Sequence, residues 1–163
     1  MTIDESQLAR WFEKFTSFRR NEFHPMVWIV GDPTIGRGVS IGGFSEVNGK
    51  DAELIIGDGC DIAAFVSINC ADSHRRCIGL SDDIRRRNIR IGDCVFIGSH
   101  SVVKGGAVIG HHSVVAAGTV VEPGEIPPYS LVSGNPMTVR AGYYENRCVE
   151  RADDSIPDER EKS

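Results

Sequence analysis

Aliphatic residues recur at every sixth position over most of this chain, with small or polar residues between them. One block of these anchors runs from Ile29 to Val47, a second from Ile56 to Ile68, and a third from Ile91 to Val121. Period six matches neither an α-helix nor the two-residue alternation of a strand. It fits a solenoid with three flat sides of about six residues each, so that one turn takes about 18 residues.

A small or β-branched residue often follows each anchor by four positions, as in the hexads IGRGVS, IGDGCD, IGDCVF and IGHHSV. Both residues are expected to point into a triangular interior, while Gly, Asp and Asn form the tight corners. Neighbouring coils then pair as short parallel strands, because no single coil hides its own apolar face. The thirteen anchors predict about four coils, and their constant phase argues against the alternative, a sandwich or barrel.

The segments on either side of the repeat lack this period. Residues 4–20 predict an amphipathic helix with a capping box at Asp4 and Gln7, and we expect it to cover the open end of the solenoid. Docking of a partner is the alternative role. The apolar side of the predicted helix consists of Leu8, Trp11, Phe12, Phe15 and Phe18. We expect three regions: a helix and lead-in at 1–27, the solenoid at 28–140, and a charged, partly mobile extension at 141–163.

The repeat is interrupted three times. The insert GKDAEL after Val47 predicts a bulge at a corner, and EPGEIPPYS after Val121 is expected to end the solenoid because it contains three prolines. The longest interruption lies between Ile68 and Ile91, where an extra loop at 72–88 is predicted. Loops that project from a rigid scaffold are common sites of binding and catalysis.

Composition narrows the classes of protein that fit. The 163 residues carry a net charge of −5, which gives no general electrostatic reason to bind nucleic acid. We expect no membrane insertion and no signal peptide, since the sequence has no long apolar run and begins with an acidic, amphipathic stretch. The five cysteines include no C-x-x-C pair, which argues against a disulfide framework and a zinc site. A reducing cytoplasm is the simplest setting.

From Trp28 to Arg140 the sequence resembles the hexapeptide-repeat acyltransferases, most specifically over Ile89–Arg140, where G-N-P precedes a basic residue. This segment is similar to the galactoside, maltose and nodulation-factor acetyltransferase branch. The resemblance implies an all-β fold, a left-handed parallel β-helix, although general crossover rules would favour the right hand. It also implies acetyl-CoA as co-substrate, a sugar or sugar-nucleotide acceptor, and a homotrimer with active sites at the subunit interfaces.

In the family that this chain resembles, a single essential histidine lies in or beside an extended loop, and His74 has that position. A neutral imidazole can take the proton from an acceptor hydroxyl or amine, so direct transfer needs no acyl-enzyme. Asp72 either orients the imidazole ring or forms a turn within the loop. Asn69 either binds the acceptor or caps the corner. A surface histidine without a catalytic role is the alternative for His74.

The resemblance also assigns residues to coenzyme A. Ser99, Ala117 and Gly118 match positions along the pantetheine arm, and Arg140 matches a basic residue near the adenine or its phosphate. Phe96 replaces a more usual Trp and is expected to wall the acceptor pocket.

Two departures from the family pattern change these expectations. Many relatives have V-T-K-D where this chain has V-E-P-G at 121–124, so phosphate contact is expected from Arg140, Lys104 or the loop arginines. Phe65 stands where sugar O-acetyltransferases often have an acceptor-binding Asn, which weakens the case for galactosides or maltose. The loop arginines at 75–76 and 85–87 form a solvated face or attract an anion such as a nucleotide diphosphate.

We therefore predict an acetyl-CoA-dependent O- or N-acetyltransferase of surface polysaccharide biosynthesis, with no metal. Two alternatives use the same scaffold. A γ-carbonic-anhydrase-like zinc enzyme would need a histidine five residues after His100, where the chain has Gly105. A non-catalytic scaffold subunit would need neither the loop nor His74.

Overall fold

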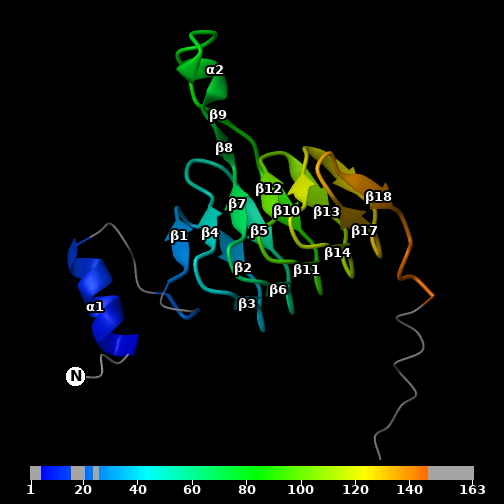
Figure 1. Ribbon diagram of the computed structural model, residues 1–163, viewed down its shortest axis with the longest axis horizontal. Helices are drawn as coiled ribbons and strands as arrows, with labels where there is room; N and C mark the ends of the chain where they lie inside the picture. Colours follow the sequence, from blue (N-terminus) through cyan, green and yellow to red (C-terminus); the bar gives the residue numbers. More distant parts are fainter. Residues whose placement is uncertain (1–4, 16–20, 24–25, 147–163) are drawn as a thin grey trace, which may run out of the picture.

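The fold is a triangular solenoid of five stacked turns, from which one finger-like loop projects (Figure 1). The computed structural model describes residues 5–15, 21–23 and 26–146. Each turn contributes one short strand to each of three parallel sheets, and the winding fits the left-handed parallel β-helix that the resemblance implies. Within the described residues no helix is long and apolar enough to cross a membrane.

The three sheets form the three faces of the solenoid. The first sheet consists of β1 (Trp28–Val30), β4 (Glu46–Asn48), β7 (Ser67–Asn69), β12 (Val102–Lys104) and β15 (Val120–Val121). The second sheet consists of β2 (Thr34–Ile35), β5 (Leu54–Ile56), β10 (Ile89–Ile91), β13 (Ala107–Ile109) and β16 (Gly124–Ile126). The third sheet consists of β3 (Ser40–Ile41), β6 (Asp61–Ile62), β11 (Phe96–Ile97), β14 (Val114–Val115), β17 (Leu131–Ser133) and β18 (Thr138–Arg140).

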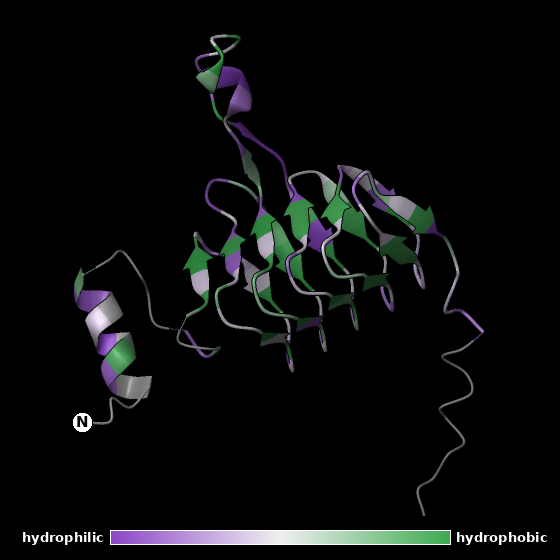
Figure 2. Ribbon diagram, viewed as in Figure 1, coloured by the Kyte–Doolittle hydropathy of each residue, from purple (hydrophilic) through white to green (hydrophobic). Residues whose placement is uncertain are grey.

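The predicted anchors form one vertical stack of aliphatic side chains behind each sheet, which accounts for the hydrophobic colour of the strands in Figure 2. In the second sheet, for example, Ile56, Ile91 and Ile109 are direct partners along the stack and are buried. The residues four positions after the anchors fill the same interior. Those that are polar hydrogen-bond to carbonyl groups, as Ser45 Oγ does to the Ala63 oxygen at 3.1 Å. Burial of these stacks stabilises every coil through its neighbours.

The prediction that the solenoid ends after Val121 was wrong, and the structure has five turns instead of about four. Strands β16 and β17 continue the second and third sheets, and their anchors Ile126 and Val132 are buried. The prolines lie in the corners before and after β16, where the sheets require no hydrogen bond from a backbone N–H. The chain reverses after Ser133, and β18 pairs antiparallel with β17.

The N-terminal helix α1 (Glu5–Phe15) is shorter than predicted, and Asp4 and Phe18 lie outside the described residues. Its side chains Trp11 and Phe15 are 57% and 74% exposed, so they do not form the expected cover over the solenoid. Phe23, in the lead-in to the first coil, packs against the core instead.

The extra loop after the third strand of the first sheet is an ordered projection, which we call the finger (residues 71–87). It begins with β8 (Ala71–Asp72), continues into the short helix α2 (His74–Cys77), and returns through β9 (Arg85–Arg86). Strands β8 and β9 pair antiparallel, with Asp72 opposite Arg85. Figure 1 shows the finger standing clear of the coils, with α2 near its outer end.

Candidate functional site

A cavity of about 390 Å³ lies where the base of the finger meets the first sheet. Outward-facing residues of β7 and β12, among them Ser67, Asn69 and Lys104, form its floor, and Asp72 and His74 line it from the finger. The strand period explains this arrangement, because the residues on either side of each buried anchor must point outwards. The rigid coils thus provide a fixed surface beneath the finger.

His74 and Asp72 form a hydrogen-bonded pair at the edge of this cavity. The imidazole Nδ1 lies 2.5 Å from Asp72 Oδ1, and the His74 backbone N–H donates to the same oxygen at 3.1 Å. One carboxylate oxygen of Asp72 thus both closes the turn and contacts the ring. The backbone bond, followed by the ring bond, lowers the pKa of Asp72. An ionised Asp72 accepts a hydrogen bond from Nδ1–H, and in this tautomer the ring's lone pair is on Nε2.

Asn69 shapes the start of the finger. Its Oδ1 accepts a hydrogen bond from the Ala71 backbone N–H at 2.8 Å, as expected for a residue that caps the corner. The same side chain lines the cavity. Its amide group is still able to donate hydrogen bonds to a ligand.

Lys104 also lines the cavity, but its ammonium group has a partner that the sequence analysis missed. Its Nζ lies 2.7 Å from Glu122 Oε2, so a phosphate would compete with this carboxylate. The period of the solenoid could have identified Glu122, since it follows Lys104 by 18 positions and thus stands one coil further along the same face.

Three residues assigned to coenzyme A lie at a different corner, where the third sheet leads into the first. The Gly118 N–H donates to the Ser99 carbonyl oxygen at 2.9 Å, and Ala117 and Gly118 are exposed. Gly118 has a φ of +72°, and a side chain added there would meet no atom within 4 Å. The backbone at Gly118 is therefore open to the surface, and we call this corner of Ser99, Ala117 and Gly118 the shelf.

The same corner of the earlier coils is aromatic. The rings of Phe44 and Phe65 stack with centroids 5.1 Å apart, and Phe65 stacks on His100 at 4.8 Å. All three residues have φ between 60° and 63°, which is the left-handed corner conformation. The equivalent position of the fourth coil is Gly118. This corner therefore carries an aromatic ring in each of the first three coils and no side chain in the fourth.

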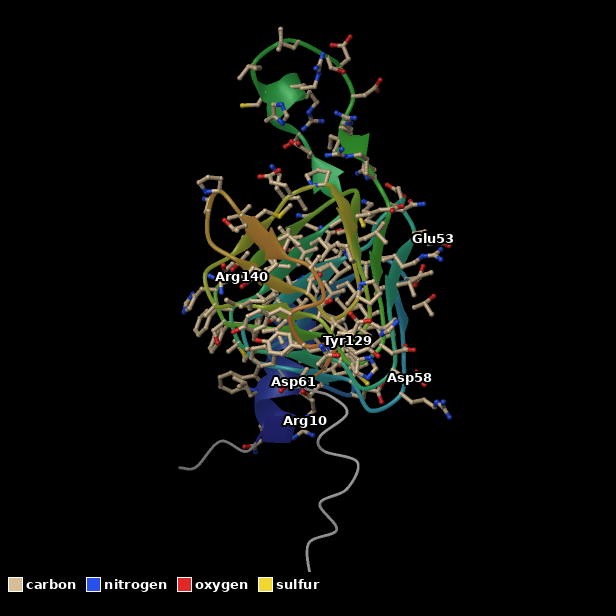
Figure 3. All side chains as sticks on the ribbon, turned by 90° about the vertical axis from the view of Figure 1, so that its right-hand side faces the viewer. Arg10, Glu53, Asp58, Asp61, Tyr129 and Arg140 are labelled. Carbon is tan, nitrogen blue, oxygen red and sulfur yellow. The ribbon has the colours of Figure 1, made fainter. Side chains whose placement is uncertain are left out.

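The other two predicted site residues belong to the third sheet and do not line the cavity. Phe96 is partly exposed on β11, and the Arg140 guanidinium lies 5.8 Å from the ring centroid of Tyr143. Figure 3 shows Arg140 and Glu53 on opposite sides of the solenoid. One chain therefore brings together His74, Asp72, Asn69 and Lys104, and it holds Phe96, Ser99, Ala117, Gly118 and Arg140 elsewhere.

Among the described residues, no group of three or more histidine, cysteine or acidic side chains has a geometry that could hold a metal ion. Cys70, which lines the cavity, is buried, and this burial raises the pKa of its thiol. A protonated thiol is a weak nucleophile.

Comparison with known proteins matches residues 88–123 to the family model of the bacterial transferase hexapeptide (six repeats). The match is confined to this segment, which is less than half of the chain. The matched segment runs from β10 in the third coil to just past β15 in the fifth, and the strands before it belong to the same stacks. No curated protein sequence matches the chain.

Solved structures with the same fold include three acetyltransferases. The polySia-specific acetyltransferase NeuO is 26% identical, with a TM-score of 0.59 over 67% of this chain and 51% of NeuO. A galactoside acetyltransferase in complex with coenzyme A is 26% identical, with a TM-score of 0.54 over 75% of this chain and 65% of that one. A hexapeptide-repeat acetyltransferase from Vibrio cholerae, complexed with acetyl-CoA, is 25% identical, with a TM-score of 0.51 over 86% and 79%. This chain thus spans about half the length of NeuO.

Proposed function

We propose that this chain is an acetyl-CoA-dependent O- or N-acetyltransferase that acts on a sugar or sugar nucleotide, in cytoplasmic synthesis of surface polysaccharide. The observation that carries the proposal is the His74–Asp72 pair at the edge of a cavity on a hexapeptide-repeat scaffold. Similar structures support the substrate classes, since they include a galactoside acetyltransferase bound to coenzyme A and the polySia-specific NeuO.

His74 is the general base of this reaction. Its Nε2 takes the proton from the acceptor hydroxyl or amine as the acceptor attacks, and ionised Asp72 stabilises the imidazolium that forms. Acetyl-CoA supplies an acetyl group that is already activated as a thioester. Direct transfer to the acceptor is favoured over an acyl-enzyme, because the thiol that lines the cavity, Cys70, is held protonated by burial.

A complete site is assembled from two neighbouring copies in a homotrimer. Support comes from the separation of the two halves within one chain, since the cavity that holds His74 includes none of the residues matched to coenzyme A. In this assembly the finger of one copy faces the shelf of the next. The neighbouring copy contributes Ser99, Ala117, Gly118 and Arg140 to coenzyme A, and Phe96 to the wall of the acceptor pocket.

The shared site leads to a complementation prediction. His74→Ala removes the base and Ala117→Arg fills the exposed shelf, so each variant alone is expected to lose acetyl transfer. Mixed oligomers, formed by dissociating and reassembling both variants together, contain some sites with an intact base and an intact shelf. We expect the mixture to regain activity, measured as thiol release from acetyl-CoA. A mixture no more active than its components would contradict a shared site, and light scattering would report the mass of the assembly.

The activity itself is tested by acetyl-CoA consumption with a panel of amino sugars, glycosides and sugar nucleotides. We expect turnover with at least one acceptor and binding of acetyl-CoA in the absence of an acceptor. Stoichiometric zinc in the purified protein would favour the carbonic-anhydrase-like alternative instead. Failure to bind acetyl-CoA would favour the non-catalytic scaffold.

A further inference from the structure

Two arginines of the finger line the cavity and form no ion pair with any carboxylate in the part of the chain that the structure describes. Arg85 and Arg87 occupy alternate positions, so they face the same side of the finger, and both line the cavity. Arg86 between them faces the other way. Its Nε donates to the Lys50 carbonyl at 3.1 Å, and its guanidinium lies 3.6 Å from Asp51.

Several arginines outside the cavity are paired. Arg37 binds Asp58 at 2.8 Å, and Arg90 lies 3.4 Å from Glu53. No carboxylate of the described residues forms an ion pair with Arg85 or Arg87. The chain does not lack carboxylates, because it has 23 acidic residues against 18 basic ones. The cavity therefore carries local positive charge in a protein with net negative charge.

Arg87 is held in position by packing. It is half-buried, and its guanidinium group rests over Gly106. A Cβ atom at position 106 would lie 3.2 Å from Arg87 Nε and 3.3 Å from its Cζ, and the glycine has a φ of +99°. Gly106 thus leaves the space that the planar group occupies, so a guanidinium without an ion-pair partner is kept beside the cavity.

Arg85 lies close to the proposed base along the finger. Its Cα is directly opposite that of Asp72 in the β8–β9 ladder, and directly opposite residues of an antiparallel pair project to the same face. An anion held by Arg85 is therefore within side-chain reach of His74. The phosphates of coenzyme A are separated from its thioester by the whole pantetheine arm. An anionic group next to the base thus belongs to the acceptor.

We propose that Arg85 and Arg87 bind an anionic group of the acceptor, a carboxylate or a phosphate, and so select an acidic sugar or a sugar phosphate over a neutral sugar. This inference rests on the proposed acetyltransferase function and names its class of acceptor. The planar guanidinium fork suits both anions, since each presents two oxygens to parallel N–H donors. Asp72 contributes one negative charge to the cavity lining, and the two arginines together outweigh it.

The test uses pairs of probes that differ only in the anion: methyl glucuronide against methyl glucoside, and glucose 1-phosphate against glucose. Binding is measured by saturation-transfer NMR on the full chain, and acetyl transfer is measured separately. We expect the charged member of at least one pair to bind about tenfold more tightly, with added salt weakening it. Whichever pair shows the preference identifies the anion.

The double variant Arg85→Gln/Arg87→Gln is expected to lose this preference while it keeps its affinity for acetyl-CoA. Arg90→Gln is the matched control, since it removes an exposed arginine on the second sheet, and it is expected to retain the preference. Equal binding of charged and neutral probes by the wild type would overturn the proposal. So would weaker acetyl-CoA binding in the double variant, because the arginines would then serve the CoA phosphates. A charge preference without acetyl transfer would support the anion site and contradict the proposed enzyme activity.

Discussion

The variant His74→Ala is expected to lower kcat for acetyl transfer by about 10²–10⁴-fold, the range typical of general-base catalysis. The acceptor hydroxyl or amine must lose a proton to attack the thioester, and the base that we propose is His74, whose ring contacts Asp72. Affinity for acetyl-CoA is expected to persist, because the shelf at Gly118 lies at another corner. The measurement is steady-state kinetics with the best acceptor of the panel, together with calorimetric titration of acetyl-CoA.

His111→Ala is the matched control for this prediction. His111 lies at a corner between the second and third sheets, where its ring packs edge-on against Tyr129 with centroids 5.1 Å apart. This variant removes an exposed imidazole away from the cavity and is expected to keep the wild-type kcat. A fully active His74→Ala protein, or an equal loss in both variants, would show that His74 is not the base.

The variant Ile109→Ala is expected to lower the free energy of unfolding by about 2–5 kcal/mol, the usual range when a large core side chain is truncated. Ile109 is 1% exposed and stands in the stack of the second sheet between Ile91 and Ile126. A cavity there removes contacts from the coils on both sides, which stabilise one another. Urea unfolding followed by circular dichroism, at one fixed protein concentration, measures the change.

Val108→Ala provides the comparison within the same strand, since Val108 points outwards and is 38% exposed. Its unfolding free energy is expected to change by less than about 0.5 kcal/mol. Similar losses in both variants would contradict the assignment of inward and outward positions along β13.

The solenoid was predictable from sequence because its interior repeats. Each anchor in the interior occupies an equivalent site, so positions such as Ile97 and Ile109 share one phase and one environment. The fifth turn was not predicted, because the segment EPGEIPPYS after Val121 departs from the six-residue pattern. Three prolines interrupt the sequence pattern there, yet corners tolerate proline, and Ile126 and Val132 continue the stacks.

The candidate site was predictable only in part. His74 was identified by resemblance, and the spacing of Asp72 and His74 allows a local contact that the structure contains. The orientation of Arg85 and Arg87 was not accessible, because it depends on the β8–β9 pairing, which has no repeat to reveal it. The separation of the cavity from the corner at Gly118 could be read from the period. The loop follows Ile68, an anchor of the first sheet, whereas Gly118 follows Val115, an anchor of the third.

The return of the chain from the finger has a consequence for how such proteins diversify. The second sheet resumes at β10, where Ile91 pairs with Ile56 as if no residues had intervened. The finger is thus a module whose length and sequence can change without shifting the register of any solenoid strand. Exchange of this one module between related scaffolds would show whether the finger carries the acceptor preference that we propose for it.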